Sequence, residues 1–163
     1  MAFSLSATSL SHTSHVAPAM MAVALLAIEL TSQDFGFTEE QSRTAAEEAA
    51  KVASGASHTL HSHHLINPAT GFSEALDAVP FADGKFVWDW NLIFPVAAAF
   101  KAASTRLATP ITWGAVWDRL MGEIPGDDAA AMRAGEVAYI ARRRSAGHHN
   151  VFVDGPHFEL GRN

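Results

Sequence analysis

The sequence predicts an α+β domain in which helices surround a few short strands. Stretches of helical length, such as residues 18–30 and 96–107, are rich in alanine and other apolar residues. The runs that resemble strands are much shorter, as in residues 75–81, and are bounded by Gly, Pro or Asp. Regular βαβ units do not connect these runs, so we do not expect a doubly wound parallel sheet. At 163 residues the chain is long enough for one compact domain with a core.

The N-terminal region predicts an extended arm or loop followed by an apolar helix. The residues up to His15 are rich in Ser and Thr and contain few apolar anchors. Pro18 suits the first turn of a helix, and the apolar run after it extends to Leu30. This run is too short to span a bilayer, and no Lys or Arg precedes it. We therefore expect a buried helix and no signal peptide.

The next elements are a capped helix and two short strands. The sequence Thr38-Glu39-Glu40-Gln41 is typical of a capping box. It predicts a helix that continues through Arg43 and ends at Gly55. Residues 75–81 predict a buried strand, and a second extended segment is expected over residues 85–90, after the turn signal Asp83-Gly84.

The C-terminal half predicts two helices and three strands. Pro95 is expected to start a helix that runs to Leu107. Asp127 suits the N-cap of a helix over residues 128–144. The short strands are expected at residues 111–114, 151–154 and 157–160.

Composition excludes several classes of function. The formal net charge of -6 argues against nucleic acid as a partner, because phosphate binding depends on clustered Lys and Arg. The one basic run, Arg142-Arg143-Arg144, is typical of a helix C-terminus, where cations interact favourably with the helix dipole. The chain has no cysteine, so disulfides and thiolate zinc sites are impossible.

A histidine-rich stretch raises the question of a metal site. Residues 58–77 contain four of the nine histidines and end in an Asp within a short apolar run. A catalytic zinc takes three protein ligands and leaves one position open, and such ligands often come from distant segments. The near ligands would come from His58, His61, His63, His64 and Asp77, and the far one from His148, His149 and His157. Spacing alone leaves a second interpretation open, in which these are exposed loop histidines that bind no metal.

Carboxylates surround the last of these histidines. Asp154 lies three residues before His157, and Glu159 lies two residues after it. Asp154 is suitably placed to accept a proton beside a metal held by His157. The alternative is that Asp154 is only a turn residue before Gly155.

Three separated motifs resemble a known family of zinc peptidases. They are Ser-His-His-Leu at 62–65, Glu-Ala-Leu-Asp at 74–77 and Asp-Gly-Pro-His-Phe-Glu-Leu at 154–160. They are similar to the Ser-x-His, Ala-x-Asp and acidic-x-x-His motifs of D-alanyl-D-alanine carboxypeptidases and phage L-alanyl-D-glutamate endopeptidases. The stretches at 5–18, 27–35, 42–44 and 112–120 also resemble the phage endolysin branch, so the resemblance covers nearly the whole chain.

The resemblance implies a fold and a set of site residues. The fold would be that of the zinc DD-peptidases (hedgehog-like), a small antiparallel sheet flanked by helices, in a single catalytic peptidase domain over residues 1–163. Zinc would be bound by His64, Asp77 and His157, with Asp154 as the catalytic acid and base. Arg43 would bind substrate or stabilise the developing oxyanion, and Ser62 would shape the site near the substrate.

The implied function is hydrolysis of bacterial peptidoglycan. Zinc would polarise the scissile carbonyl and activate a water molecule. The bond that the resemblance implies is the one between L-Ala and D-Glu in the stem peptides. A D-alanyl-D-alanine carboxypeptidase is an alternative, and a non-catalytic zinc-containing module that binds peptidoglycan is another. We expect a monomer that does not bind nucleic acid or insert into membranes. It would accumulate in the host cytoplasm and reach the cell wall once the membrane is permeabilised.

Overall fold

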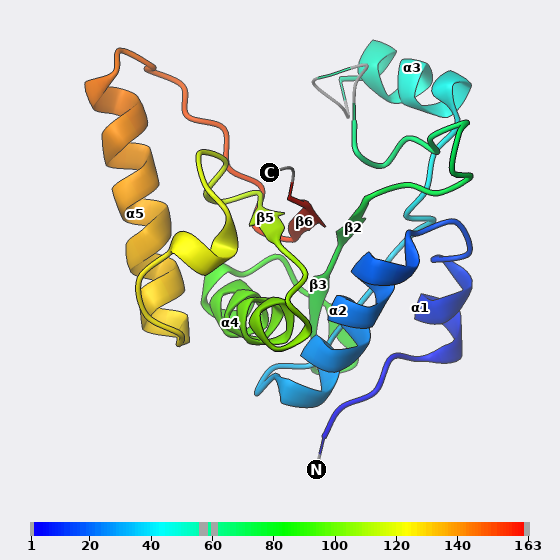
Figure 1. Ribbon diagram of the computed structural model, residues 1–163, viewed down its shortest axis with the longest axis horizontal. Coiled ribbons are helices and arrows are strands. Elements are labelled where there is room, and N and C mark those ends of the chain that lie inside the picture. The colour runs from blue at the N-terminus through cyan, green and yellow to red at the C-terminus, as the bar shows by residue number, and fades with distance from the viewer. Residues whose placement is uncertain (1, 56–58, 60–61, 162–163) are drawn as a thin grey trace.

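The computed structural model describes residues 2–55, 59 and 62–161, and it confirms the α+β class. Short strands lie between helices that come from all parts of this region (Figure 1). The helices are α1 (Ala7–Ser11), α2 (Pro18–Leu30), α3 (Ala45–Ala53), α4 (Trp90–Leu107), the 3₁₀-helix η1 (Met121–Glu123) and α5 (Ala129–Ser145). The strands are β1 (Phe35–Gly36), β2 (Ala75–Asp77), β3 (Val79–Ala82), β4 (Lys85–Phe86), β5 (Ile111–Trp113) and β6 (His157–Leu160).

The strands form two small antiparallel sheets. One has the order β1-β3-β4 and the other the order β2-β6-β5. The single strand predicted at residues 75–81 is therefore two strands, which belong to different sheets and are separated by Ala78. The N–H of Ala78 donates to the carbonyl of Pro156 at 2.9 Å, and this bond continues the pairing of β2 with β6. As a result Asp77 lies opposite His157 in the register.

Helices α2 and α4 supply much of the core. The two helices pack against each other, and α4 also packs against α5, which lies far from α1 and α3 in Figure 1. The Phe100 ring of α4 stacks on the Phe158 ring of β6 with centroids 3.9 Å apart, and both side chains are fully buried. This contact anchors β6 to the core next to His157, the first residue of the strand. No helix in the described part of the chain is long and apolar enough to cross a membrane.

Two predictions about the N-terminal third are wrong. The segment before His15 is not only an arm or loop, because it contains the short helix α1, which Ser6 caps by accepting a hydrogen bond from the N–H of Ser9. Helix α3 begins at Ala45, after a capping box formed by Thr44 and Glu47 rather than by Thr38 and its neighbours. Residues 38–43 lie outside the helix because their backbone groups bond to other segments.

The beginning of α4 also differs from the prediction. The helix begins at Trp90, because Asp89 caps it by accepting from the N–H of Asn91, and it continues through Pro95. Only Lys85 and Phe86 of the segment at 85–90 form a strand. The N-cap of α5 is Asp128, one residue after the predicted Asp127, and residues 151–154 are not a strand. The helix at 18–30 and the strands at 111–113 and 157–160 are confirmed.

Candidate metal centre

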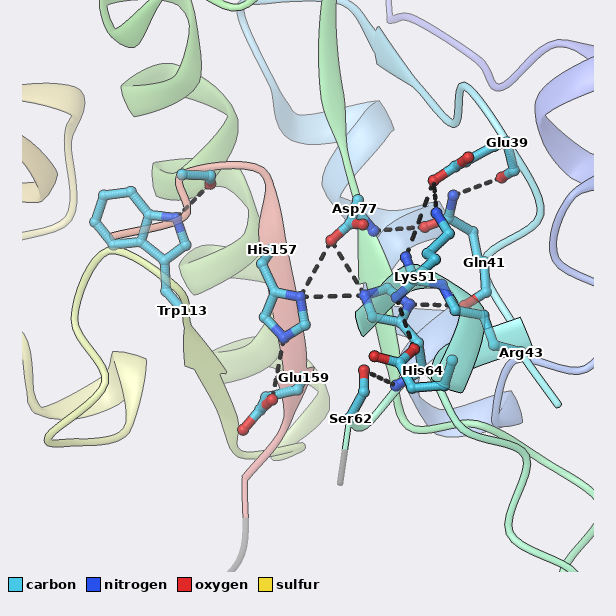
Figure 2. A network of polar contacts seen from close by, with 12 residues as sticks. Glu39, Gln41, Arg43, Lys51, Ser62, His64, Asp77, Trp113, His157 and Glu159 are labelled. Atoms are coloured by element: carbon cyan, nitrogen blue, oxygen red, sulfur yellow. Dashed lines mark hydrogen bonds and ion pairs between the residues drawn. The ribbon is translucent and has the colours of Figure 1, made fainter. Parts of the chain in front are cut away.

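His64, Asp77 and His157 meet at one end of the β2–β6 pair. Asp77 is the last residue of β2, and His157 is the first residue of β6. His64 lies in the loop before β2, which is held by a parallel bridge between Arg43 and Leu65. In this bridge the N–H of Arg43 donates to the carbonyl of His64 at 2.7 Å. Three segments are thus needed to bring the three side chains together (Figure 2).

The facing atoms of these side chains are spaced like the ligands of one ion. His64 Nε2 is 3.2 Å from Asp77 Oδ1 and 3.2 Å from His157 Nδ1. His157 Nδ1 is 3.1 Å from the same Asp77 oxygen. Ligands placed about 2.0 Å from a tetrahedral zinc ion would be roughly 3.3 Å apart. Among the described residues, this is the one group of three His or carboxylate side chains identified as able to hold a metal ion.

Hydrogen bonds on the outer side of each ring determine its tautomer. His64 Nδ1 lies 2.7 Å from the carbonyl oxygen of Gln41, which can only accept, so this nitrogen carries the proton. His157 Nε2 lies 3.0 Å from a carboxylate oxygen of Glu159, so this nitrogen also carries a proton. In the neutral rings, two nitrogen lone pairs and one carboxylate oxygen then face each other with no hydrogen between them. Such an arrangement requires a cation, either a proton or a metal ion, and so the residues present fit zinc.

The electrostatics of the cluster also favour a bound cation. Burial opposes ionisation of Asp77, but the charge of His64 and the hydrogen bonds from His157 and His64 outweigh it and hold the pKa of Asp77 far below its usual range. Burial also opposes protonation of His157. The hydrogen bonds to Asp77 and Glu159 and the charges of these carboxylates prevail, and they raise the pKa of His157 to about 9. The site therefore attracts positive charge strongly when no metal is present.

One side of the cluster is open. The side chains of His64 and His157 are 4% and 9% exposed, whereas that of Asp77 is 25% exposed. A cavity of about 420 Å³ is lined by Ser62, His63 and Leu65, the neighbours of His64 in the chain, but by none of the three candidate ligands, so the open side of the cluster is the exposed side of Asp77. A catalytic metal site needs an open position of this kind for water and substrate.

Asp154 is held beside the cluster by a turn that leads into β6. The N–H of Asp154 donates to the carbonyl of Gly114 at 2.8 Å, and Trp113 Nε1 donates to the carbonyl of Gly155 at 2.6 Å. A Cβ at position 114 would overlap the carbonyl oxygen of Asp154, so only glycine fits there. Burial, reinforced by the charge of Asp77, raises the pKa of the Asp154 carboxyl, which makes it a stronger base than an exposed Asp.

Arg43 and Ser62 both lie close to His64 in the chain or in space, but they make different contacts. Arg43 Nη1 forms a 3.1 Å ion pair with Glu48, whose side chain is 1% exposed, and Arg43 Nη2 lies 3.9 Å from Glu39. Burial and the charge of Asp77 raise the pKa of Asp154, and the charge of Arg43 opposes this rise in part, so the guanidinium acts on the site electrostatically. Ser62 Oγ accepts a hydrogen bond from the N–H of His64 at 3.2 Å, and this bond stabilises the backbone just before the candidate metal ligand His64.

The other candidate histidines that the structure describes do not enter the cluster. His63 lies beside it, with Nδ1 3.7 Å from Glu74 and Nε2 3.8 Å from Glu159. His148 and His149 are exposed after α5. The remaining near candidates, His58 and His61, lie outside the described residues.

The sequence placed Glu159 beside His157 without indicating its role, and it did not point to Gln41 at all. Glu159 has the same orientation as His157 because residues two apart in a strand face the same side, and this alternation was a usable signal. Gln41 binds His64 through its backbone carbonyl, for which a sequence gives no signal.

The chain is similar to known proteins in sequence and in fold. A family model described as phage L-alanyl-D-glutamate peptidase matches residues 1–140 and so ends before Asp154 and His157. An L-alanyl-D-glutamate peptidase of Escherichia phage T5 is 33% identical over 104 residues, which are 63% of this chain and 73% of the relative. The crystal structure of the Serratia marcescens L-Ala D-Glu endopeptidase ChiX has a similar fold, with a TM-score of 0.63 and 23% identity. That similarity covers 95% of this chain and 87% of the other.

Proposed function

Because the chain belongs to the phage L-alanyl-D-glutamate peptidase family, we propose that it is a zinc-dependent endopeptidase that cleaves the L-Ala–D-Glu bond of peptidoglycan stem peptides. The observation that carries the zinc assignment is the convergence of two imidazole lone pairs and a carboxylate oxygen at 3.1–3.2 Å. The names of the phage T5 and Serratia relatives support the bond that is cleaved. In a phage setting, the enzyme would act on the wall after the host membrane is permeabilised.

In this proposal the three clustered side chains hold the metal. His64 Nε2, Asp77 Oδ1 and His157 Nδ1 would be the donors, with Glu159 holding the His157 ring in place. When bound, zinc supplies Lewis-acid chemistry that polarises a carbonyl and makes water more acidic. The exposed side of Asp77 would face the scissile peptide.

Asp154 would move the proton. Its raised pKa suits a carboxylate that takes a proton from the attacking water and returns it to the nitrogen of the leaving D-Glu. Arg43 would bind a negatively charged substrate group or the developing oxyanion, with Glu48 holding its guanidinium. Ser62, at the junction of His64 and the cavity, would line the substrate path.

The substitution Asp154→Asn tests this assignment. The variant should keep its zinc, because Asp154 is not a ligand, and should lose about 10²–10⁴-fold in the rate of hydrolysis of purified peptidoglycan. Zinc content is measured on the same samples. Asp83→Asn is the matched control, since Asp83 is exposed in the β3–β4 turn and its positive φ of 52° is tolerated by Asn. Undiminished hydrolysis by the Asp154 variant would refute the role given to this residue.

Mass spectrometry of the digested muropeptides identifies the bond. New amino-terminal D-Glu is the expected product, and free D-Ala would show a carboxypeptidase instead. Chelator should abolish the release of new amino termini, and added zinc should restore it. Binding to peptidoglycan by the zinc-loaded protein without such release would identify a non-catalytic module.

A further inference from the structure

Gln41 is a buried polar residue in the segment between β1 and α3. It is 1% exposed, although amide side chains are mostly found at the surface. Residues 38–43 were expected to be helical. Instead they are not part of a helix, and Arg43 forms a parallel bridge with Leu65 in the loop that contains His64. A buried amide in an irregular segment must find its hydrogen-bond partners in neighbouring segments. Two of the residues that bond to Gln41, His64 and Asp77, are candidate metal ligands.

Each half of Gln41 contacts a different ligand residue. Its backbone carbonyl accepts from the Nδ1–H of His64 at 2.7 Å, which directs the Nε2 lone pair of that ring into the cluster. Its side-chain Oε1 accepts from the backbone N–H of Asp77 at 2.5 Å, at the end of β2. Figure 2 shows Gln41 on the side of His64 and Asp77 that faces away from His157. One residue therefore links two ligands that are 13 positions apart in the chain.

Gln41 is itself fixed in place by two further bonds. Its backbone N–H donates to the carbonyl of His12 at 2.8 Å. Its side-chain Nε2 donates to the carbonyl of Glu39 at 2.6 Å, so the amide cannot rotate without losing a bond. The backbone and the side chain are both anchored, and both present an acceptor to a ligand residue.

We propose that Gln41 is a positioning residue of the metal centre, which fixes the distance between His64 Nε2 and the Asp77 carboxylate. This inference rests on the proposed function, in which these two residues and His157 hold zinc. Groups that orient metal ligands typically change metal affinity by 10–100-fold when they are removed. A residue with only a structural role would change the stability of the protein and leave the zinc affinity of the folded protein unchanged.

The test is zinc affinity of the folded protein, measured by competition with a chromophoric chelator. Gln41→Met keeps the length and volume of the side chain and removes the acceptor for the Asp77 N–H. We expect its zinc dissociation constant to rise about 10–100-fold. Gln41→Glu keeps an oxygen acceptor at this place and should bind zinc more tightly than Gln41→Met. If the Met variant does not fold, Gln41→Asn replaces it, because the shorter amide does not reach the Asp77 N–H.

A matched control shows whether a change in zinc affinity comes from lost positioning of the ligands or from the loss of any buried hydrogen bond. Ser104 is buried in α4, and its Oγ donates to the carbonyl of Thr109 at 2.6 Å, away from the cluster. Ser104→Ala should lower the melting temperature and leave zinc affinity unchanged. Equal zinc affinity of wild type and Gln41→Met would overturn this inference alone. Absence of zinc binding by the wild type, or binding unaffected by His157→Gln, would overturn the proposed function with it.

Discussion

Removal of the metal should make the stability of the protein fall as pH rises through the neutral range. In the metal-free protein, His157 has a pKa of about 9, against an ordinary value of 6.5. A group whose pKa is raised on folding stabilises the folded state fully below its unfolded pKa, and this contribution is lost as pH rises through the folded pKa. The affected window therefore runs from about pH 6.5 to about pH 9.

The magnitude follows from the size of the shift. A difference of about 2.5 pKa units, at 1.36 kcal/mol per unit, corresponds to about 3 kcal/mol. The discount for exposure is small, because the His157 side chain is 9% exposed. For a chain of this length, 1 kcal/mol corresponds to roughly 2–4 °C, so the melting temperature should fall by roughly 6–12 °C between pH 6 and pH 9.5.

Zinc should cancel this fall. A metal ion replaces the proton on His157, so its apparent affinity rises with pH in the same window. Binding adds RT ln(1 + [Zn]/Kd) to the free energy of unfolding, and the difference between the loaded and the metal-free protein should widen as pH rises.

Calorimetry over this pH range, with and without zinc, measures both curves. His157→Gln is the control, because it removes the titrating group and leaves all others. Parallel curves for the loaded and metal-free wild type would contradict the proposed ligand set. The same slope in metal-free His157→Gln would show that another group causes the pH dependence.

Two further substitutions test the supports of the site. Gly114→Ala should push the Asp154 turn away from the cluster and destabilise the protein by about 1–3 kcal/mol in urea unfolding, whereas Gly122→Ala, with open space around its Cβ, should not. A stable and fully active Gly114→Ala would mean that the turn need not be held in this position. Arg43→Ala should cost about 3–5 kcal/mol, because it leaves the buried Glu48 carboxylate without this ion pair, and Glu48→Gln in the same chain should recover part of that loss. A loss in the double variant as large as in Arg43→Ala would argue against a charge effect.

The sequence predicted elements well where a local signal determined them. The helix at 18–30 has a proline in its first turn and a continuous apolar run, and both ends are as predicted. Predictions were wrong where tertiary contacts compete with a local signal. The capping-box pattern at Thr38 is not used, because the Gln41 and Arg43 backbones bond to His12, His64 and Ile66.

In the candidate site, too, the sequence predicted some features and not others. The motifs around His64, Asp77 and His157 gave residue types and order, and the structure brings these three side chains together. The partners that orient them depend on backbone groups and strand pairing. The split of residues 75–81 into two sheets shows this, because it sets Asp77 opposite His157, and no pattern in the sequence marks Ala78 as the break.

The candidate metal centre joins segments that are far apart along the chain. His64 and His157 are separated by 93 positions, and Asp77 and His157 by 80. A chain without cysteine has no disulfide to close loops of this size. An ion held by all three side chains would act as a cross-link, and a covalent cross-link over such a loop removes chain entropy worth on the order of 4 kcal/mol from the unfolded state. Unlike a disulfide, this cross-link would open with a chelator and close again with metal, with no oxidation or reduction.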